Sequence, residues 1–222
     1  MMKLTLKGGE VREFENGLSV AEIAKEISMG LYRNACACRI NGEVMDLRTV
    51  VEEDCELEIV TFDDADGKHA FNHTASHIMA QAVKRLYPDV KLTIGPAIDN
   101  GFYYDFDCGD KPFGPEDLEK LEAEMKKIVK EGLELEKFEL SPEEAVKLME
   151  EKNEPYKIEL INEHAGKGEN ISFYKQGEFT ELCAGPHLIT VSPVKAFKLT
   201  QTTGAYWRGD AKNKMLCRVK LL

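Results

Sequence analysis

Two pairs of residues with the same spacing are the main candidates for chemistry in this sequence. His73 and His77 are four residues apart, and so are Cys183 and His187. Three imidazoles and one thiol form a ligand set that suits zinc, and they also form a polar cluster that can orient and activate a water molecule. The residue types and their spacing leave both chemistries open. Taken one by one, the histidines are equally compatible with an ordinary hydrogen-bonded pair, and Cys183 with a small core residue.

The first pair is predicted to lie on a helix over residues 72–86, which a Tyr-Pro pair ends. At about 100° per residue, His73 and His77 share one face of this helix and lie one turn apart. The apolar stripe centres on roughly the opposite face, so we expect the histidines to lie outside the main core stripe. Thr74 stands where a zincin-type metallopeptidase carries glutamate, which argues against that class of enzyme. A glycine and a proline within the second pair disfavour a helix there, and a loop after a strand is predicted.

The elements that must position these residues divide into two α+β units. Residues 1–62 are predicted to form a ubiquitin-like β-grasp domain, and residues 63–222 a larger α+β domain with an antiparallel sheet. The first unit combines two hairpins (3–14 and 35–47), a helix that starts at the Ser19 capping box, and a closing strand (55–61). Residues 63–68 are acidic and read as a linker. In the second unit we expect further helices from near Pro115 and Ser141, and strands over 156–161, 171–174, 179–182, 196–200 and 215–220.

Composition limits the compartment and the partners. The chain has 222 residues and a net charge of −11, from 29 basic and 40 acidic residues. That balance argues against a broad basic face that grips nucleic acid. No apolar run reaches the roughly 18 residues that a membrane span needs, and no signal peptide is visible. The six cysteines are scattered and include no CxxC pair, which is typical of a reducing compartment, so a cytoplasmic location is expected.

The two pairs together resemble the HxxxH and CxxxH signature of the threonyl- and alanyl-tRNA synthetase editing domains. Residues 94–105 and 203–210 are similar to stretches of the threonyl enzymes, and a β-grasp (TGS) domain ahead of them also points to that branch. The resemblance covers essentially the whole chain. It implies that this sequence is a fragment that hydrolyses mischarged seryl-tRNA, and that the family continues beyond Leu222 into aminoacylation and anticodon-binding domains.

Editing of this kind has a physical reason. Threonine and serine differ by one methyl group, which is worth only about 1–3 kcal/mol of discrimination in a binding pocket. A second site that hydrolyses the serine ester and sterically excludes the threonine methyl group supplies the rest. Such a site needs an oriented water, a proton acceptor, and hydrogen-bond donors or positive charge where the oxyanion forms. The partner is then the acceptor end of tRNA(Thr), which an acidic domain can accept if other domains hold the tRNA.

The resemblance also implies roles for individual residues. His73 and His77 orient water and move protons, since imidazole titrates nearest neutral pH, and His187 completes the cluster. Lys157 stabilises developing negative charge, although as a bare residue it reads as a solvated lysine on a strand. Glu181 holds the substrate's α-ammonium group or fixes a histidine tautomer.

Two further residues take roles from the same resemblance. Tyr104 stacks on or hydrogen-bonds the terminal adenosine, whereas the bare residue reads as core. Cys183 has three readings: a group that orients water, a metal ligand, or a nucleophile. The resemblance favours the first, so editing is expected to need no cofactor; zinc on the two pairs remains the alternative that spacing alone favours. A homodimer is expected for the full-length enzyme.

Two positions depart from the family's pattern. Glu181 stands where the family usually has aspartate, and Ala184 where it often has arginine. Glu181 keeps the charge but moves the carboxylate by one methylene, and Ala184 removes a possible phosphate contact. Two alternative functions therefore stay open: a non-catalytic tRNA-binding or regulatory module, and a zinc-dependent hydrolase of another small ester.

Overall fold

The computed structural model of the chain describes residues 1–98, 101–166 and 171–221. Asp99 and Asn100, which belong to the stretch similar to threonyl enzymes, lie outside the described residues. The chain divides into two compact units, residues 1–74 with 185–189 and residues 75–184 with 190–222. The predicted domain boundary between residues 62 and 63 stays a prediction.

The first unit contains a mixed five-stranded sheet in the order β2-β1-β7-β4-β5. Strand β1 pairs with β7 in parallel, and the other neighbours are antiparallel. The short strands β3 and β6 form a separate pair. Its elements are β1 (Met2–Leu6), β2 (Val11–Phe14), β3 (Leu18–Ser19), α1 (Val20–Ile27), α2 (Met29–Asn34), β4 (Ala35–Ile40), β5 (Glu43–Met45), β6 (Val50–Val51) and β7 (Cys55–Thr61). The predicted hairpins, helix and closing strand are confirmed, and so is the β-grasp fold.

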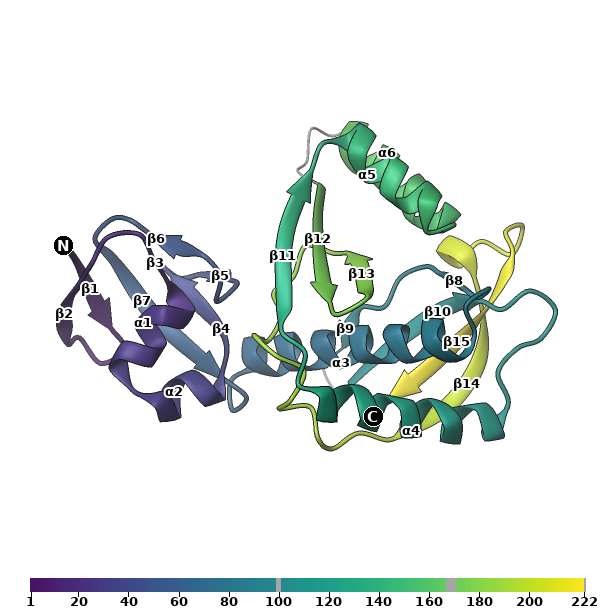
Figure 1. The fold of residues 1–222 in the computed structure, drawn as a ribbon, viewed down its shortest axis with the longest axis horizontal. Coiled ribbons are helices and arrows are strands. Elements are labelled where there is room, and N and C mark those ends of the chain that lie inside the picture. The colour runs from purple at the N-terminus through teal and green to yellow at the C-terminus, as the bar shows by residue number, and fades with distance from the viewer. Residues whose placement is uncertain (99–100, 167–170, 222) are drawn as a thin grey trace. The chain divides into compact units, whose positions relative to one another are not determined.

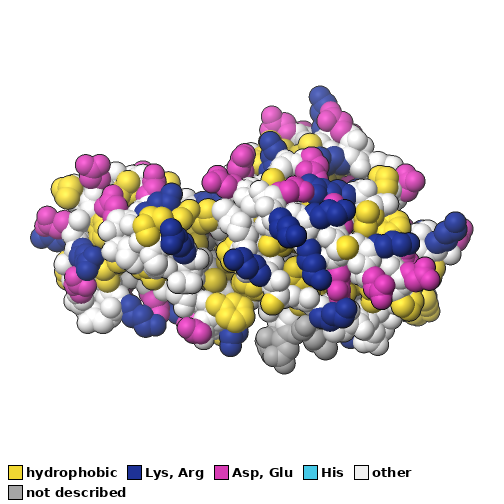
Figure 2. Space-filling model, turned by 60° about the horizontal axis from the view of Figure 1, so that its bottom comes forward, with side chains coloured by type: hydrophobic (Ala, Val, Ile, Leu, Met, Phe, Trp, Pro, Cys, Tyr) yellow, Lys and Arg dark blue, Asp and Glu magenta, His cyan; other side chains and the backbone are white. Residues whose placement is uncertain are grey.

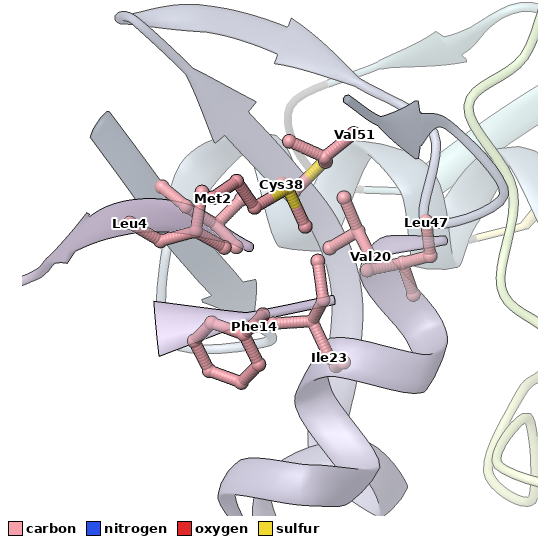
Figure 3. Packing of buried hydrophobic residues seen from close by; sticks show 10 residues of the cluster. Met2, Leu4, Phe14, Val20, Ile23, Cys38, Leu47 and Val51 are labelled. Carbon is pink, nitrogen blue, oxygen red and sulfur yellow. The ribbon is translucent and has the colours of Figure 1, made fainter. Parts of the chain in front are cut away.

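Helix α1 starts where its capping box predicts. The Ser19 side chain accepts from the Glu22 backbone N–H, and the Glu22 carboxylate accepts from the Ser19 backbone N–H. These two bonds satisfy backbone donors that the first helical turn leaves without partners. The helix then buries Val20 and Ile23 among the residues of the sheet's core (Figure 3). Helix capping therefore sets where α1 starts, and side-chain burial sets which of its faces packs on the sheet.

We expect Ile23→Ala to destabilise the β-grasp fold by about 2–5 kcal/mol, because Ile23 is fully buried and the truncated side chain leaves a cavity in the core. Urea unfolding followed by circular dichroism measures the change. The control is Glu26→Ala on the exposed side of the same helix, which should stay within about 0.5 kcal/mol of the parent. Equal effects of the two substitutions would contradict the packing of α1 on the sheet.

Helix α3 (Ala65–Leu86) starts earlier than the sequence predicts, and the residues read as a linker are largely its first turn. The Asp64 side chain accepts from the Asp66 backbone N–H at 2.9 Å, and the Asp64 carbonyl accepts from the Lys68 backbone N–H at 2.9 Å. The Arg39 guanidinium on β4 donates to both aspartates and to Glu58. The acidic run therefore caps the helix and pairs with the half-buried Arg39, which composition alone does not reveal.

The second unit contains two antiparallel sheets, in the orders β14-β15-β10-β8 and β11-β12-β13, with β9 paired to β10. Its elements after α3 are β8 (Lys91–Leu92), β9 (Ala97–Ile98), β10 (Gly101–Asp107), α4 (Pro115–Glu131), β11 (Leu135–Leu140), α5 (Pro142–Glu151), α6 (Pro155–Gly166), β12 (Ile171–Gln176), β13 (Phe179–Leu182), β14 (Leu199–Tyr206), the 3₁₀ turn Trp207–Gly209 and β15 (Met215–Leu221). Figure 1 shows α5 and α6 side by side next to β11 and β12. The predicted α+β class with an antiparallel sheet is confirmed.

One predicted strand is wrong: residues 156–161 lie in the helix α6 and not in a strand. Pro155 occupies the first helical position, where its missing N–H costs nothing, and the Glu154 carbonyl accepts from the Lys157 backbone N–H. Ile158 and Ile161 then lie three residues apart on one face of α6. Both pack in the hydrophobic cluster that also contains residues of α5. The predicted strand over 196–200 also shifts, since β14 begins at Leu199.

Arg85 near the end of α3 gathers three carboxylates of the second unit. It donates to Glu178 at 2.6 Å, to Glu131 at 2.7 Å and to Glu124 at 3.3 Å. The hydrogen bond from Arg85 is the largest influence on Glu178 and lowers the pKa of this carboxyl from 4.5 to about 2. Since Glu124 and Glu131 lie on α4 and Glu178 follows β12, one guanidinium links three elements.

This pKa shift predicts a pH dependence of folding. Because the folded-state pKa of Glu178 lies below its unfolded value, its contribution is complete above pH 4.5 and is lost as the pH falls through about 2. We expect the free energy of unfolding to decline over this window, and Arg85→Met to flatten the decline. Urea titrations at several pH values measure both slopes. Arg12→Met, which removes an exposed pair with Glu10, serves as the control; the same flattening in both variants would contradict the assignment.

The described part of the chain contains no helix that is both long and apolar enough to cross a membrane. On the face in Figure 2, Lys and Arg side chains lie among Asp and Glu side chains.

Candidate active site

Both histidines of the first pair lie on α3, one turn apart as predicted. His73 is half-buried, whereas His77 is only 3% exposed and its ring meets the edges of Tyr174 and Phe179. Every residue from 74 to 83 is buried, so α3 has a buried polar side as well as its apolar stripe. Lying outside the apolar stripe therefore does not expose His77.

The second pair lies on a loop that directly follows β13, as predicted. Cys183 continues the ladder for one more residue, because its backbone N–H donates to the Ser172 carbonyl at 3.1 Å and its carbonyl accepts from the Ser172 hydroxyl at 2.7 Å. Gly185 then adopts φ +80°, a left-handed conformation that favours glycine. The turn brings His187, which is fully buried, to a fixed position at the end of the loop.

The structure gathers both pairs into one group. His73, His77, Cys183 and His187 each offer one nitrogen or sulfur atom, and these atoms all lie within 4.8 Å of one another. The ring centroids of His73 and His187 are 4.2 Å apart. Four groups that donate or accept protons and lie this close can hold one water molecule or one small cation in common.

The donor set fits zinc chemically. A tetrahedral site with Zn–N of about 2.0–2.1 Å and Zn–S of about 2.3 Å places its ligand atoms roughly 3.3–3.8 Å apart. The observed limit of 4.8 Å is somewhat wider, so small side-chain rotations would close the set around a metal. The same spacing suits a water that bridges polar groups at hydrogen-bond distance. The geometry is therefore compatible with both interpretations of the sequence, a zinc site and a polar cluster that orients water.

Lys157, Glu181 and Tyr104 form a second polar group, and all three are buried. The Lys157 ammonium lies 2.5 Å from one Glu181 oxygen and donates to the Tyr104 hydroxyl at 3.3 Å. The Tyr104 hydroxyl donates to the other Glu181 oxygen at 2.7 Å. Each charge thus has its counter-charge and a further hydrogen bond, the condition under which an ion pair tolerates burial.

Tyr104 is held as a neutral hydrogen-bond donor. Burial raises the pKa of its phenol well above the ordinary value, the Glu181 carboxylate adds to the rise, and Cys183 contributes more weakly. A side chain at Gly95 would collide with the Tyr104 ring, so glycine is required where the chain crosses that ring. The predicted contact of Tyr104 with an adenosine stays a prediction, since in this structure its hydroxyl contacts Glu181.

Sequence reasoning named seven site residues and missed others that hold them. Thr74, read only as evidence against a zincin, has its hydroxyl 3.1 Å from His187 Nδ1 and accepts from the Leu188 backbone N–H. Its place inside the first pair could have drawn attention to it. Asp46 and Arg48 carry no such pattern in the sequence, yet both contact the backbone of residues 187–189.

We expect Lys157→Met to destabilise the fold by about 3–5 kcal/mol, because Glu181 would keep a buried charge without its partner. Adding Glu181→Gln should recover much of that loss, since the remaining buried groups are neutral. Chemical denaturation of the single and double variants measures the recovery. Lys175→Met, on the exposed side of β12, is the matched control. If the double variant is as unstable as the single one, the ion pair is not what stabilises this group.

Two protein-family models match the chain. The TGS domain model matches residues 2–61. The model described as the threonyl and alanyl tRNA synthetase second additional domain matches residues 171–220. Glu181, Cys183 and His187 lie within the second match, and Asp46 and Arg48 within the first.

Curated relatives give the same family over nearly the whole chain. A threonine–tRNA ligase from Acetivibrio thermocellus is 61% identical over 219 residues, which are 99% of this chain and 34% of that protein. The threonine–tRNA ligases of Clostridium perfringens strain 13 and Clostridium tetani are 62% and 60% identical over the same length, which is 33% and 34% of those proteins. The chain thus spans about a third of the length of the relatives it matches.

Proposed function

Because the chain belongs to the threonyl-tRNA synthetase family, with a TGS domain and a second additional domain, we propose that it hydrolyses mischarged seryl-tRNA(Thr). The observation that carries this proposal is the group in which His73, His77, Cys183 and His187 bring four ligand atoms within 4.8 Å. The relatives' own ligase activity belongs to proteins about three times as long. For this chain the proposal is limited to removal of the wrong amino acid.

In the proposed reaction, a water oxygen adds to the ester carbonyl carbon and a histidine takes one water proton. The bond between that carbon and the ribose oxygen then breaks, the ribose oxygen gains a proton, and serine and tRNA are released. His73 suits the role of proton acceptor because it is the half-buried member of the pair, which a substrate can reach. His77, His187 and the Cys183 thiol would orient the water.

Lys157 suits the stabilisation of the negative charge that develops on the carbonyl oxygen. Its ammonium is buried and held by Glu181 and Tyr104, so it needs little reorganisation during the reaction. Glu181 pairs with the Lys157 ammonium and accepts from the Tyr104 hydroxyl, and a carboxylate has about four acceptor positions. It therefore retains capacity for the substrate's α-ammonium group, the first of the two roles that the resemblance implies.

Zinc-dependent hydrolysis of a small ester is the second candidate, favoured by one observation. The three histidines and the cysteine supply the donor types of a tetrahedral zinc site, and their ligand atoms lie within 4.8 Å of one another. Zinc there would polarise a bound water or the ester carbonyl. We propose metal-free editing because the family's threonyl branch is expected to edit without a metal. The acceptor end of tRNA(Thr) as the partner, the homodimer of the full-length enzyme and a cytoplasmic location remain parts of the proposal.

The test compares deacylation of seryl-tRNA(Thr) and threonyl-tRNA(Thr) by the purified chain. We expect loss of serine alone, unaffected by a chelator, and a fall of about 10²–10⁴-fold with His73→Ala, the usual share of one acid–base group. His164→Ala is the matched control, since this histidine lies on α6 and is not a member of the group.

Other outcomes decide between the alternatives. Stoichiometric zinc in the purified protein, with activity that a chelator removes, would replace the metal-free proposal with the zinc hydrolase. A chain that binds tRNA(Thr) but leaves both esters intact, also when it is joined to the remaining domains of a relative, would favour a binding module.

A further inference from the structure

A short segment after β5 carries a buried acid and an arginine that the proposed chemistry does not use. Asp46 is 7% exposed, and Arg48 is half-buried. The Asp46 carboxylate accepts from the Arg48 backbone N–H at 2.8 Å and from its guanidinium at 2.9 Å. This local pair fixes the direction of both side chains. Asp46 and Arg48 lie within the TGS match, and all of the contacts described below lie within the first compact unit.

Both side chains hold the backbone of the segment 187–189. The other Asp46 oxygen accepts from the His187 backbone N–H at 3.1 Å. The Arg48 guanidinium donates to the carbonyl of Leu188 at 2.9 Å and to the carbonyls of His187 and Ile189 at 3.3 Å each. One ion pair thus binds one N–H and three successive carbonyls, groups about 140 positions away in the sequence. Hydrogen bonds from a charged donor are stronger than neutral ones, so this clamp defines the backbone position of His187.

The Thr74 hydroxyl holds the His187 ring from the other side. Its single proton goes to the Ala70 carbonyl at 2.9 Å, the usual bond of a helical threonine to the preceding turn. Its oxygen accepts from the Leu188 backbone N–H at 3.0 Å and lies 3.1 Å from His187 Nδ1. Because the hydroxyl proton is already donated, the contact with Nδ1 requires that nitrogen to carry the hydrogen. Neutral His187 therefore has Nδ1 protonated, and Nε2 is its acceptor or ligand atom.

We propose that Asp46, Arg48 and Thr74 are positioning residues of the editing site: the first two fix the backbone of His187, and Thr74 fixes its tautomer with Nε2 as acceptor. The inference deepens the proposed function and rests on it for its kinetic consequence. It assigns to the β-grasp part of the chain a role in the hydrolytic step that acts through His187. The tautomer itself is a property of the protein and can be measured without any substrate.

The first experiment records ¹⁵N–¹H correlation spectra of the histidine rings in the intact chain, with His187 assigned by the loss of its signals in His187→Gln. We expect His187 to be protonated on Nδ1 at pH 8. Thr74→Val, which keeps the shape and removes the hydroxyl, should shift the ring toward the other tautomer, whereas Thr74→Ser should retain it. Protonation of His187 on Nε2 in the parent protein would overturn the inference whatever the activity proves to be.

The second experiment measures seryl-tRNA deacylation. We expect Arg48→Met and Asp46→Ala to lower kcat about 10–100-fold with little change in KM, since small displacements of a catalytic group cost up to about 10²-fold. Arg48→Lys keeps the positive charge but loses the planar guanidinium with its several donors. We expect its kcat to lie between that of the parent and that of Arg48→Met. Arg33→Met, an exposed arginine on α2, is the control.

The two readouts separate the possible failures. Circular dichroism spectra and thermal melts select the variants that remain folded, and Arg48→Lys remains informative if Arg48→Met does not fold. Folded variants that keep both the tautomer and the parent kcat would overturn the positioning role. A parent protein with the expected tautomer but no deacylation of either ester would overturn the proposed function and leave the Thr74 part of the inference supported.

Discussion

The buried polar side of α3 sets the main constraint on the second half of this chain. Polar residues recur at every fourth position on α3, at His73, His77, Gln81 and Arg85. A polar group that loses water must regain hydrogen bonds inside the protein, so each of these turns requires a partner. Gln81 accepts from the Gln176 amide and donates to the Glu178 carboxylate, and Arg85 donates to Glu178 as well. A helix with this pattern therefore packs favourably against a hairpin that carries polar side chains, here β12–β13.

The same hairpin leads directly to the candidate site. Phe179, Glu181 and Cys183 alternate along β13 and its extension, and alternate residues of a strand face the same side. Phe179 meets the ring of His77, Glu181 pairs with Lys157, and Cys183 lies with His73, His77 and His187. The contacts of Gln81 and Arg85 with residues 176–178 thus set the position of the β12–β13 hairpin along α3. This position brings Glu181 and Cys183 into the candidate site. The polar groups that stabilise the fold and those available for chemistry form one continuous row.

Much of this arrangement could be predicted from the sequence where local signals decide it. The capping boxes at Ser19 and Ser141 set the starts of α1 and α5, and the equal spacing of the two pairs marked the site. The predictions failed where contacts between residues far apart in the sequence decide the structure. Residues 156–161 alternate like a strand, but Pro155 and the packing of Ile161 make them a helix. The roles of Arg48 and Thr74 depend on a loop that no local pattern brings near them, so only the fold reveals them.

The departures from the family's pattern gain a physical meaning in this structure. A glutamate at position 181, longer than aspartate by one methylene, reaches both Lys157 and Tyr104 at hydrogen-bond distance. The change therefore keeps the charge balance of the buried group, and it argues for retained chemistry more than for a site reduced to binding. Ala184 is exposed, so the missing arginine at this position removes a surface charge and leaves the buried groups unchanged. Under the proposed function, the missing arginine would lower the affinity for the negatively charged tRNA end, where phosphate contacts act, and would leave the hydrolytic step unchanged.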